Sequence, residues 1–197
     1  HFTTHLLDLR NHGRSFHDDD MSYDAMMQDL IDYMNHHNIA KAHLLGHSLG
    51  GRLVINFARK YGDKIDKLIV ADMAPKAYPP HHNAIFKGLK SVDFAQIETR
   101  QDVDAVLQQY IPELGVRQFL LKNVFRTDDG YAFRFNLDAL DKSYHAMVGE
   151  ELMTGEFDGP TLFLGGEKSN YILPEDEFAI KKRFPNAEID KVSKAGH

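Results

Sequence analysis

Short apolar runs alternate with amphipathic stretches along the first part of the chain. Residues 5–9 are predicted to be the end of a short buried strand, and the apolar runs 42–46 and 68–72 predict two further short strands. Between these runs, apolar side chains recur at helical spacing over 22–38 and 53–62, which predicts two helices. Strands that alternate with helices pair in parallel, because each helix carries the chain back across the sheet. The pattern therefore predicts an α/β protein with a mostly parallel sheet and flanking helices.

This alternation stops at Pro79-Pro80 and resumes at Pro160. The residues between them form several polar helical stretches and contain no clear apolar strand. After Pro160 we expect a strand over 161–165, a helix near 174–184 and a strand over 187–192. The chain is therefore predicted to have a core made of residues 1–78 and 151–197, interrupted by a helical cap insertion over 79–150.

The motif Gly46-His47-Ser48-Leu49-Gly50 lies between a predicted strand and a predicted helix. In that setting G-x-S-x-G is typical of a nucleophile elbow, a sharp turn that presents the serine hydroxyl at the end of a strand. The glycines two positions on either side are expected to prevent collisions with neighbouring backbone. The helix directs N–H groups at a developing oxyanion, so the Leu49 N–H is the expected first donor. The alternative is a chance match in a glycine-containing turn.

A serine nucleophile needs a base, and the chain has 12 histidines. His197 follows Gly196 in the loop after the last predicted strand, which places its imidazole at the same edge of the sheet as Ser48. His47 is next to Ser48 in sequence, but its side chain is expected to leave the turn in another direction. The histidine pairs 36–37 and 81–82 have no acidic neighbours at metal-ligand spacing, so no metal site is predicted.

Asp72 is the expected acid because it ends the strand that follows the nucleophile's helix. The chain order Ser48, Asp72, His197 is the order of Ser-Asp-His triads on this kind of scaffold. Many such enzymes instead carry the acid after a later strand, where this chain has Ser169. Glu167 comes too early in that turn and is expected to face solvent. The alternative for Asp72 is a strand-end residue that caps the next turn.

Composition excludes several other kinds of function. The chain of 197 residues has a formal charge of −6 and no long basic run, which argues against nucleic-acid binding. It has no cysteine, which excludes disulfides and a cysteine nucleophile and fits a cytoplasmic location. No apolar run approaches the about 20 residues that span a bilayer, so no membrane association is predicted. No cofactor is implied.

Three segments together resemble a known family. They are the run from Asp8 to Ser15 (Asp-Leu-Arg-Asn-His-Gly-Arg-Ser), the Gly-His-Ser-Leu-Gly-Gly elbow, and Ile69-Val-Ala-Asp-Met-Ala-Pro75. The chain resembles the YbfF-type esterase and acyl-CoA thioesterase family of α/β-hydrolases over nearly its whole length. The resemblance implies an α/β-hydrolase fold and places the acid at Asp72. It also implies preceding strands, which carry the second oxyanion donor, and a closing helix, and we expect these to lie outside the 197 residues.

The function expected from these observations is hydrolysis of short- to medium-chain acyl esters, or of acyl-CoA, by a Ser-His-Asp triad. The alternatives are another α/β-hydrolase activity, such as lactone, C–C bond or perhydrolase chemistry, and a non-catalytic binding module on the same fold. The candidates for an apolar acyl tunnel or for packing within the cap are Phe86, Leu89, Phe119, Leu120, Phe125 and Phe135. The candidates for contact with CoA phosphates are Arg117, Lys122, Arg126 and Arg134. The expected partner is a small-molecule ester or thioester, and the sequence leaves the oligomeric state open.

Overall fold

A computed structural model describes residues 2–149 and 155–197 of the chain. The chain divides into two compact units. Unit 1 consists of residues 1–22 and 79–149, and unit 2 consists of residues 23–78 and 150–197.

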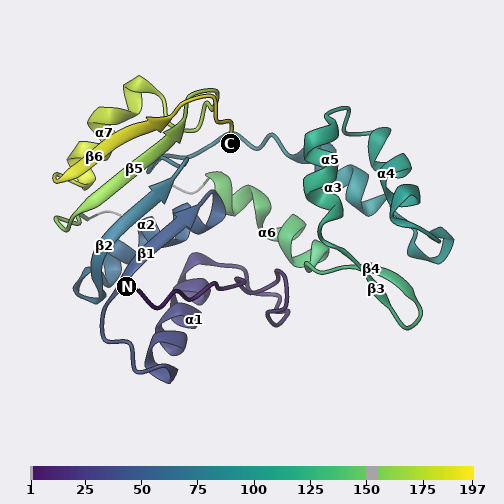
Figure 1. Cartoon of the computed structure of the whole chain (residues 1–197), viewed down its shortest axis with the longest axis horizontal. Helices are drawn as coiled ribbons and strands as arrows, with labels where there is room; N and C mark the ends of the chain where they lie inside the picture. Colours follow the sequence, from purple (N-terminus) through teal and green to yellow (C-terminus); the bar gives the residue numbers. More distant parts are fainter. Residues whose placement is uncertain (1, 150–154) are drawn as a thin grey trace. The chain divides into compact units, whose positions relative to one another are not determined.

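Unit 2 is built on a four-stranded sheet in which every pair of neighbouring strands is parallel. The strand order is β1 (Ala42–His47), β2 (Ile65–Ala71), β5 (Thr161–Gly166) and β6 (Ala187–Val192), which run side by side in Figure 1. All four strands were predicted, β1, β2 and β5 from short apolar runs and β6 from the stretch over 187–192. Because the strands are parallel, their carboxyl ends meet at one edge of the sheet.

Helices cover this sheet where the apolar spacing predicted them. They are α1 (Tyr23–His36), α2 (Leu49–Lys60) and α7 (Glu177–Arg183), with short 3₁₀ turns η1 (Gly62–Lys64) and η3 (Pro174–Asp176). The α2 helix packs against β1 and β2, and α1 packs on α2. Because α2 lies between the sheet and α1, eight of its twelve residues are buried. The centre of the core includes Phe57, Phe163 and Phe184, each of which has no exposed surface.

The prediction of a buried strand over residues 5–9 is wrong. This segment has no regular secondary structure, and the Leu6 side chain is 92% exposed. A strand is stable only when its backbone pairs with a neighbour. Among the described residues no strand pairs with this segment, and the sheet ends at β1.

Unit 1 is mainly helical, as predicted for the insertion, but it also contains a hairpin. Its elements are α3 (Asn83–Lys90), η2 (Phe94–Gln96), α4 (Arg100–Gln108), α5 (Leu114–Leu121), β3 (Val124–Thr127), β4 (Gly130–Phe133) and α6 (Leu137–Gly149). The β3–β4 hairpin has a two-residue turn, Asp128-Asp129, between the paired residues Thr127 and Gly130. Gly130 has a φ of 138°, which favours glycine.

Residues 1–22 belong to unit 1, whereas the sequence analysis counted them with the core. The reason is a polar connection centred on Asn11, a residue with no exposed surface. The Asn136 backbone N–H donates to the Asn11 carbonyl at 3.0 Å, and the Asn136 amide contacts the Asn11 side-chain oxygen at 3.2 Å. His17 also contacts the Arg134 carbonyl oxygen at 3.2 Å. The domain boundaries at 78 and 150 stay a prediction.

Candidate active site

Ser48 stands at the sharp turn between β1 and α2. Its backbone has φ 52° and ψ −116°, a conformation that non-glycine residues rarely adopt. The Ser48 N–H donates to the Ala71 carbonyl at 3.3 Å, which ties the turn to the end of β2. Strained backbone of this kind occurs at functional sites, where the surrounding structure holds it in place. The strand–turn–helix geometry expected of a nucleophile elbow is present.

The glycines of the elbow have different roles. A Cβ atom on Gly46 would lie 2.1 Å from the Gly50 carbonyl oxygen, so the position cannot hold a side chain without moving backbone. A Cβ on Gly51 would lie 3.0 Å from the Met73 Cβ. A Cβ on Gly50 would meet no atom within 4 Å. The expected crowding is therefore confirmed at Gly46 and wrong at Gly50, and Gly51 is the second crowded position.

His197 lies between Ser48 and Asp72. The His197 Nε2 atom is 2.9 Å from the Ser48 Oγ, and the His197 Nδ1 atom is 2.7 Å from an Asp72 carboxylate oxygen. A carboxylate beside Nδ1 favours the tautomer with the proton on Nδ1. The Nε2 lone pair then accepts the Ser48 hydroxyl, which is the arrangement that a general base requires. The structure brings together the three residues that the sequence singled out.

Asp72 follows β2 and is held by donors from the segment after β5. One carboxylate oxygen accepts the Gly166 N–H at 3.0 Å, and the other accepts the Ser169 hydroxyl at 2.5 Å as well as His197. Burial acts to raise the pKa of Asp72, but the hydrogen bonds from Ser169, Gly166 and His197 outweigh it and hold the pKa below its usual value. Asp72 therefore faces His197 as a carboxylate.

Ser169 lies where the sequence offered an alternative position for the acid, and its hydroxyl binds Asp72, the predicted acid. The sequence identified this position but gave no sign of its hydrogen bond to Asp72. The Ser169 Oγ also accepts the Tyr171 N–H at 3.2 Å. The only sequence signal of the contact between Ser169 and Tyr171 is their Ser-x-Tyr spacing after β5.

Glu167 is exposed, as expected, but it has a structural contact that the sequence analysis missed. Its carboxylate accepts the Lys194 N–H at 2.6 Å and the Ser193 hydroxyl at 3.0 Å. These hydrogen bonds lower the pKa of Glu167. The residue thus anchors the loop that carries His197.

The His47 ring does not leave the site as expected. Its centroid lies 4.8 Å from that of His197, with the two ring planes 39° apart. Partial burial and the neighbouring His197 lower the pKa of His47. The His47 ring therefore lies beside the imidazole of His197.

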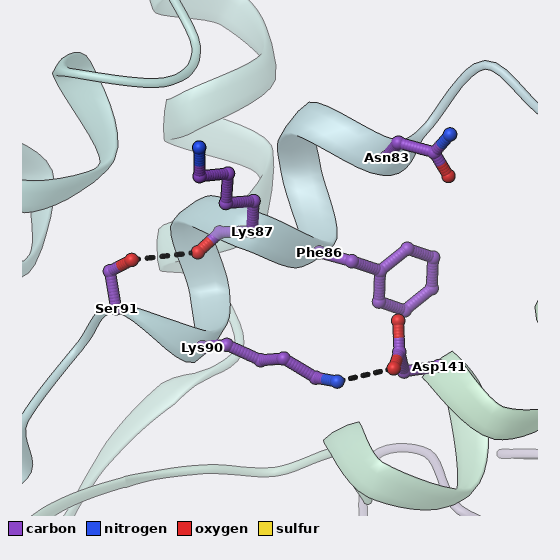
Figure 2. Close-up of a pocket in the computed structure, with 6 residues that line it drawn as sticks. All are labelled: Asn83, Phe86, Lys87, Lys90, Ser91 and Asp141. Carbon is purple, nitrogen blue, oxygen red and sulfur yellow. Dashed lines mark hydrogen bonds and ion pairs between the residues drawn. The ribbon is translucent and has the colours of Figure 1, made fainter.

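The candidate acyl-binding residues Phe86, Phe119 and Phe125 all lie in unit 1. Phe86 lines a cavity of about 360 Å³ beside α3 and α6, shown in Figure 2. The other residues that line this cavity are polar, and its Lys90 ammonium pairs with Asp141. Phe119 is 63% exposed, and the Phe125 ring carries the Arg134 guanidinium 4.7 Å from its centroid.

Other candidates from the cap are buried within it. Leu89, Leu120 and Phe135 belong to the hydrophobic core of unit 1, so packing within the cap accounts for them. Arg117 is 5% exposed, pairs with Asp104 at 2.7 Å and donates to two backbone carbonyls. Because this guanidinium is committed to the interior, the expectation that Arg117 meets a phosphate is wrong.

Comparison with known proteins agrees with this geometry. The sequence profile of the α/β hydrolase fold matches residues 1–99. Esterase YbfF of Escherichia coli is 38% identical over 97% of this chain and 74% of its own length. The chain belongs to the α/β-hydrolase family. A putative esterase/lipase of Haemophilus influenzae is also 38% identical to this α/β-hydrolase, over 100% of the chain and 68% of the relative.

This α/β-hydrolase also resembles a solved structure. A marine microorganism esterase superposes with a TM-score of 0.91 and 39% identity, over 96% of this chain and 76% of the esterase. The α/β-hydrolase described here is a carboxylic ester hydrolase that takes a small-molecule ester as substrate. None of the helices in the described ranges has the length and hydropathy that crossing a bilayer requires.

Proposed function

We propose that this α/β-hydrolase cleaves short- to medium-chain acyl esters, acyl-CoA thioesters among them, through a triad and an acyl-enzyme intermediate. The observation that carries the proposal is the line of hydrogen bonds from Ser48 through His197 to Asp72, at 2.9 and 2.7 Å. A hydroxyl, an imidazole and a carboxylate in this order form the machinery of acyl transfer.

In the proposed mechanism the Ser48 Oγ attacks the ester carbonyl carbon while the His197 Nε2 takes the hydroxyl proton. The negative charge that forms on the carbonyl oxygen is stabilised by the Leu49 N–H, the first amide of α2, because the first N–H groups of a helix have no partner within it. His197 then protonates the leaving alcohol or thiol as the C–O or C–S bond breaks. Asp72 holds the imidazole and stabilises its cation.

Water completes the proposed cycle. His197 takes a proton from a water molecule, whose oxygen attacks the acyl-enzyme carbonyl, and returns that proton to the Ser48 Oγ as the acid leaves. No cofactor enters these steps. Phe86, Phe119 and Phe125 stay proposed contacts for the acyl chain, and a cytoplasmic location stays a prediction.

Substitution of the nucleophile tests the mechanism. We expect Ser48→Ala to lower turnover by on the order of 10⁶, because the Ser48 hydroxyl is the group that His197 Nε2 contacts. The measurement is hydrolysis of a p-nitrophenyl ester, together with labelling by a fluorophosphonate probe. Ser91→Ala is the matched control, because the Ser91 hydroxyl only binds the Lys87 carbonyl and Tyr110 in unit 1. Substantial labelling of Ser48→Ala would mean that another residue is the nucleophile.

The acyl group and the leaving group are tested separately. Acetyl and hexanoyl esters of p-nitrophenol, compared with acetyl-CoA and hexanoyl-CoA, separate chain length from leaving group. Turnover of the CoA thioesters within an order of magnitude of the esters would support the thioesterase part of the proposal. Ester turnover without thioester turnover would restrict the proposal to oxygen esters.

A further inference from the structure

The imidazole of His197 is stacked on an aromatic ring that the mechanism above does not use. The ring of Tyr171 lies 3.7 Å from the His197 ring, centroid to centroid, and the two planes are 11° apart. This is a nearly parallel stack. Tyr171 follows β5 in the chain and is half-buried in unit 2.

Hydrogen bonds hold the Tyr171 backbone on both sides. The Tyr78 hydroxyl donates to the Tyr171 carbonyl at 2.7 Å and accepts the Ala74 N–H at 2.8 Å. Burial raises the pKa of Tyr78 well above its usual value, so this hydroxyl keeps its proton and remains a donor. On the other side, the Tyr171 N–H donates to Ser169, whose hydroxyl donates to Asp72. The stacked ring is therefore tied to the backbone that follows β2 and to the acid.

The stack supplies a restraint that the triad's own hydrogen bonds lack. The two bonds of His197 leave from Nδ1 and Nε2, on opposite sides of the ring, so they fix the line joining Ser48 and Asp72. Rotation of the ring about that line changes both bonds little. It does tilt the plane of the ring, and with it the direction in which Nε2 delivers its proton to the leaving group. A ring stacked face to face prevents this rotation.

The stack also favours the charged imidazole. A parallel stack with little offset is an unfavourable arrangement for two neutral rings, because their negative faces oppose each other. It becomes favourable when one ring is a cation over the face of the other. His197 is a cation when it has taken the Ser48 proton, so the contact strengthens at that point of the reaction.

We propose that Tyr171 is a positioning residue for His197, fixing the tilt of the imidazole and favouring its cation. This inference rests on the proposed function of Ser48 and His197. Tyr171 acts through the imidazole and takes no part in bond making. Its loss should therefore change kcat and leave KM close to its original value.

The test compares Tyr171→Leu, which removes the ring, with Tyr171→Phe, which keeps it. Turnover of one p-nitrophenyl ester by Tyr171→Leu should fall roughly 10–100-fold, the range expected for a small displacement of a catalytic group. Tyr171→Phe should recover most of the loss. Tyr61→Leu is the matched control, because this half-buried tyrosine of unit 2 packs on Phe57. It should keep the kcat of the original protein.

A second readout is independent of activity. The carbon-bound protons of the His197 ring lie over the Tyr171 face, so ring current should shift their NMR resonances upfield. The shift should persist in Tyr171→Phe and disappear in Tyr171→Leu. If Tyr171→Leu does not fold, Tyr78→Phe serves instead, because it removes only the hydroxyl that holds Tyr171; it should lower kcat and reduce the shift.

The outcomes separate the two proposals. An original protein that hydrolyses no ester and whose Ser48 is not labelled refutes the proposed function, and the role of Tyr171 falls with it. An active original protein with full kcat in Tyr171→Leu refutes only the positioning role. A rise in KM at constant kcat would make Tyr171 a substrate contact and would also overturn the inference. Loss of activity in Tyr171→Phe equal to that in Tyr171→Leu would do the same.

Discussion

At the scale of single residues, Asp72 is the point where three segments of unit 2 meet. Its backbone has a φ of 50°, which turns the chain sharply after β2. Its carboxylate accepts hydrogen bonds from Gly166, Ser169 and His197. The residue therefore combines an electrostatic role beside the imidazole with a structural role between the ends of β2 and β5.

We expect Asp72→Asn to lower turnover by roughly 10⁴. The asparagine amide would donate to the His197 Nδ1, which leaves the ring proton on Nε2, opposite Ser48. The imidazole then cannot accept the hydroxyl proton. Glu167→Gln is the matched control, because glutamine keeps an oxygen that accepts the Lys194 N–H, so its turnover should stay near that of the original protein. Steady-state hydrolysis of one short-chain ester by both variants decides the matter. If Glu167→Gln lost its activity and Asp72→Asn kept it, the acid would lie after β5.

The lowered pKa of Asp72 gives this site a defined pH dependence. A carboxyl group whose pKa is lower in the folded protein stabilises the fold above its ordinary pKa of 3.8. That contribution is lost as the pH falls through the lowered value. When the free energy of unfolding is measured against pH, the loss caused by protonation of Asp72 should therefore occur below the pH at which an ordinary aspartate titrates.

At the scale of elements, the elbow depends on how closely β1 approaches the first turn of α2. The Gly46 Cα faces the Gly50 carbonyl, and the same turn carries Ser48 in a strained conformation. The same turn of α2 is packed against the segment after β2 through Gly51 and Met73. The position of Ser48, the proposed nucleophile, is thus set by the close contacts of Gly46 and Gly51.

Gly46→Ala and Gly50→Ala should have opposite effects although they are symmetric about Ser48. An alanine at 46 forces backbone apart and should destabilise the protein by about 3 kcal/mol or more, since over-packing in a tight core costs roughly 1–3 kcal/mol even where side chains can adjust. An alanine at 50 enters open space on a helix, where it is favoured over glycine by about 1 kcal/mol. Thermal and urea unfolding of the two variants measure the difference. Equal destabilisation would mean that the helix start, and not the steric contact, limits the elbow.

The sequence predicted the elements of unit 2 because short apolar runs mark β1, β2 and β5, and apolar residues at helical spacing mark α1 and α2. The runs at 42–46 and 68–72 became β1 and β2, and the elbow followed from five residues. The failures have physical causes. The apolar residues 5–9 were expected to be buried, but pairing decides whether such a run is a strand. Two contacts were also missed, the stack of Tyr171 on His197 and the hydrogen bond from Ser169 to Asp72. Each joins segments that are distant in sequence, and the periodicity of apolar residues contains no information about such contacts.

At the scale of the whole molecule, the chain crosses between its two units three times. Residues 1–22 belong to unit 1, residues 23–78 to unit 2, residues 79–149 again to unit 1, and residues 150–197 again to unit 2. The Ser48–His197–Asp72 line lies entirely in unit 2. Unit 1 has its own hydrophobic core, built from α3, α4, α5 and the hairpin. Local stability can therefore differ between the units, because cooperative opening follows contiguous packed regions.

Asn11 is the residue on which the assembly of unit 1 depends most directly. It adopts a φ of 64°, and its side chain donates to the Asp18 carbonyl at 2.8 Å and accepts the Asp18 N–H at 2.8 Å. We expect Asn11→Ala to destabilise unit 1 by on the order of 3 kcal/mol, because the partly buried bonds to the Asp18 backbone are lost and alanine disfavours a positive φ. Hydrogen exchange followed by mass spectrometry should show faster exchange over 79–149, with the amides of 23–78 unchanged. Asn83→Ala, at an exposed position of α3, is the control and should leave both units protected. Equal loss of protection in both units would show that residues 1–22 stabilise the chain as a single cooperative unit.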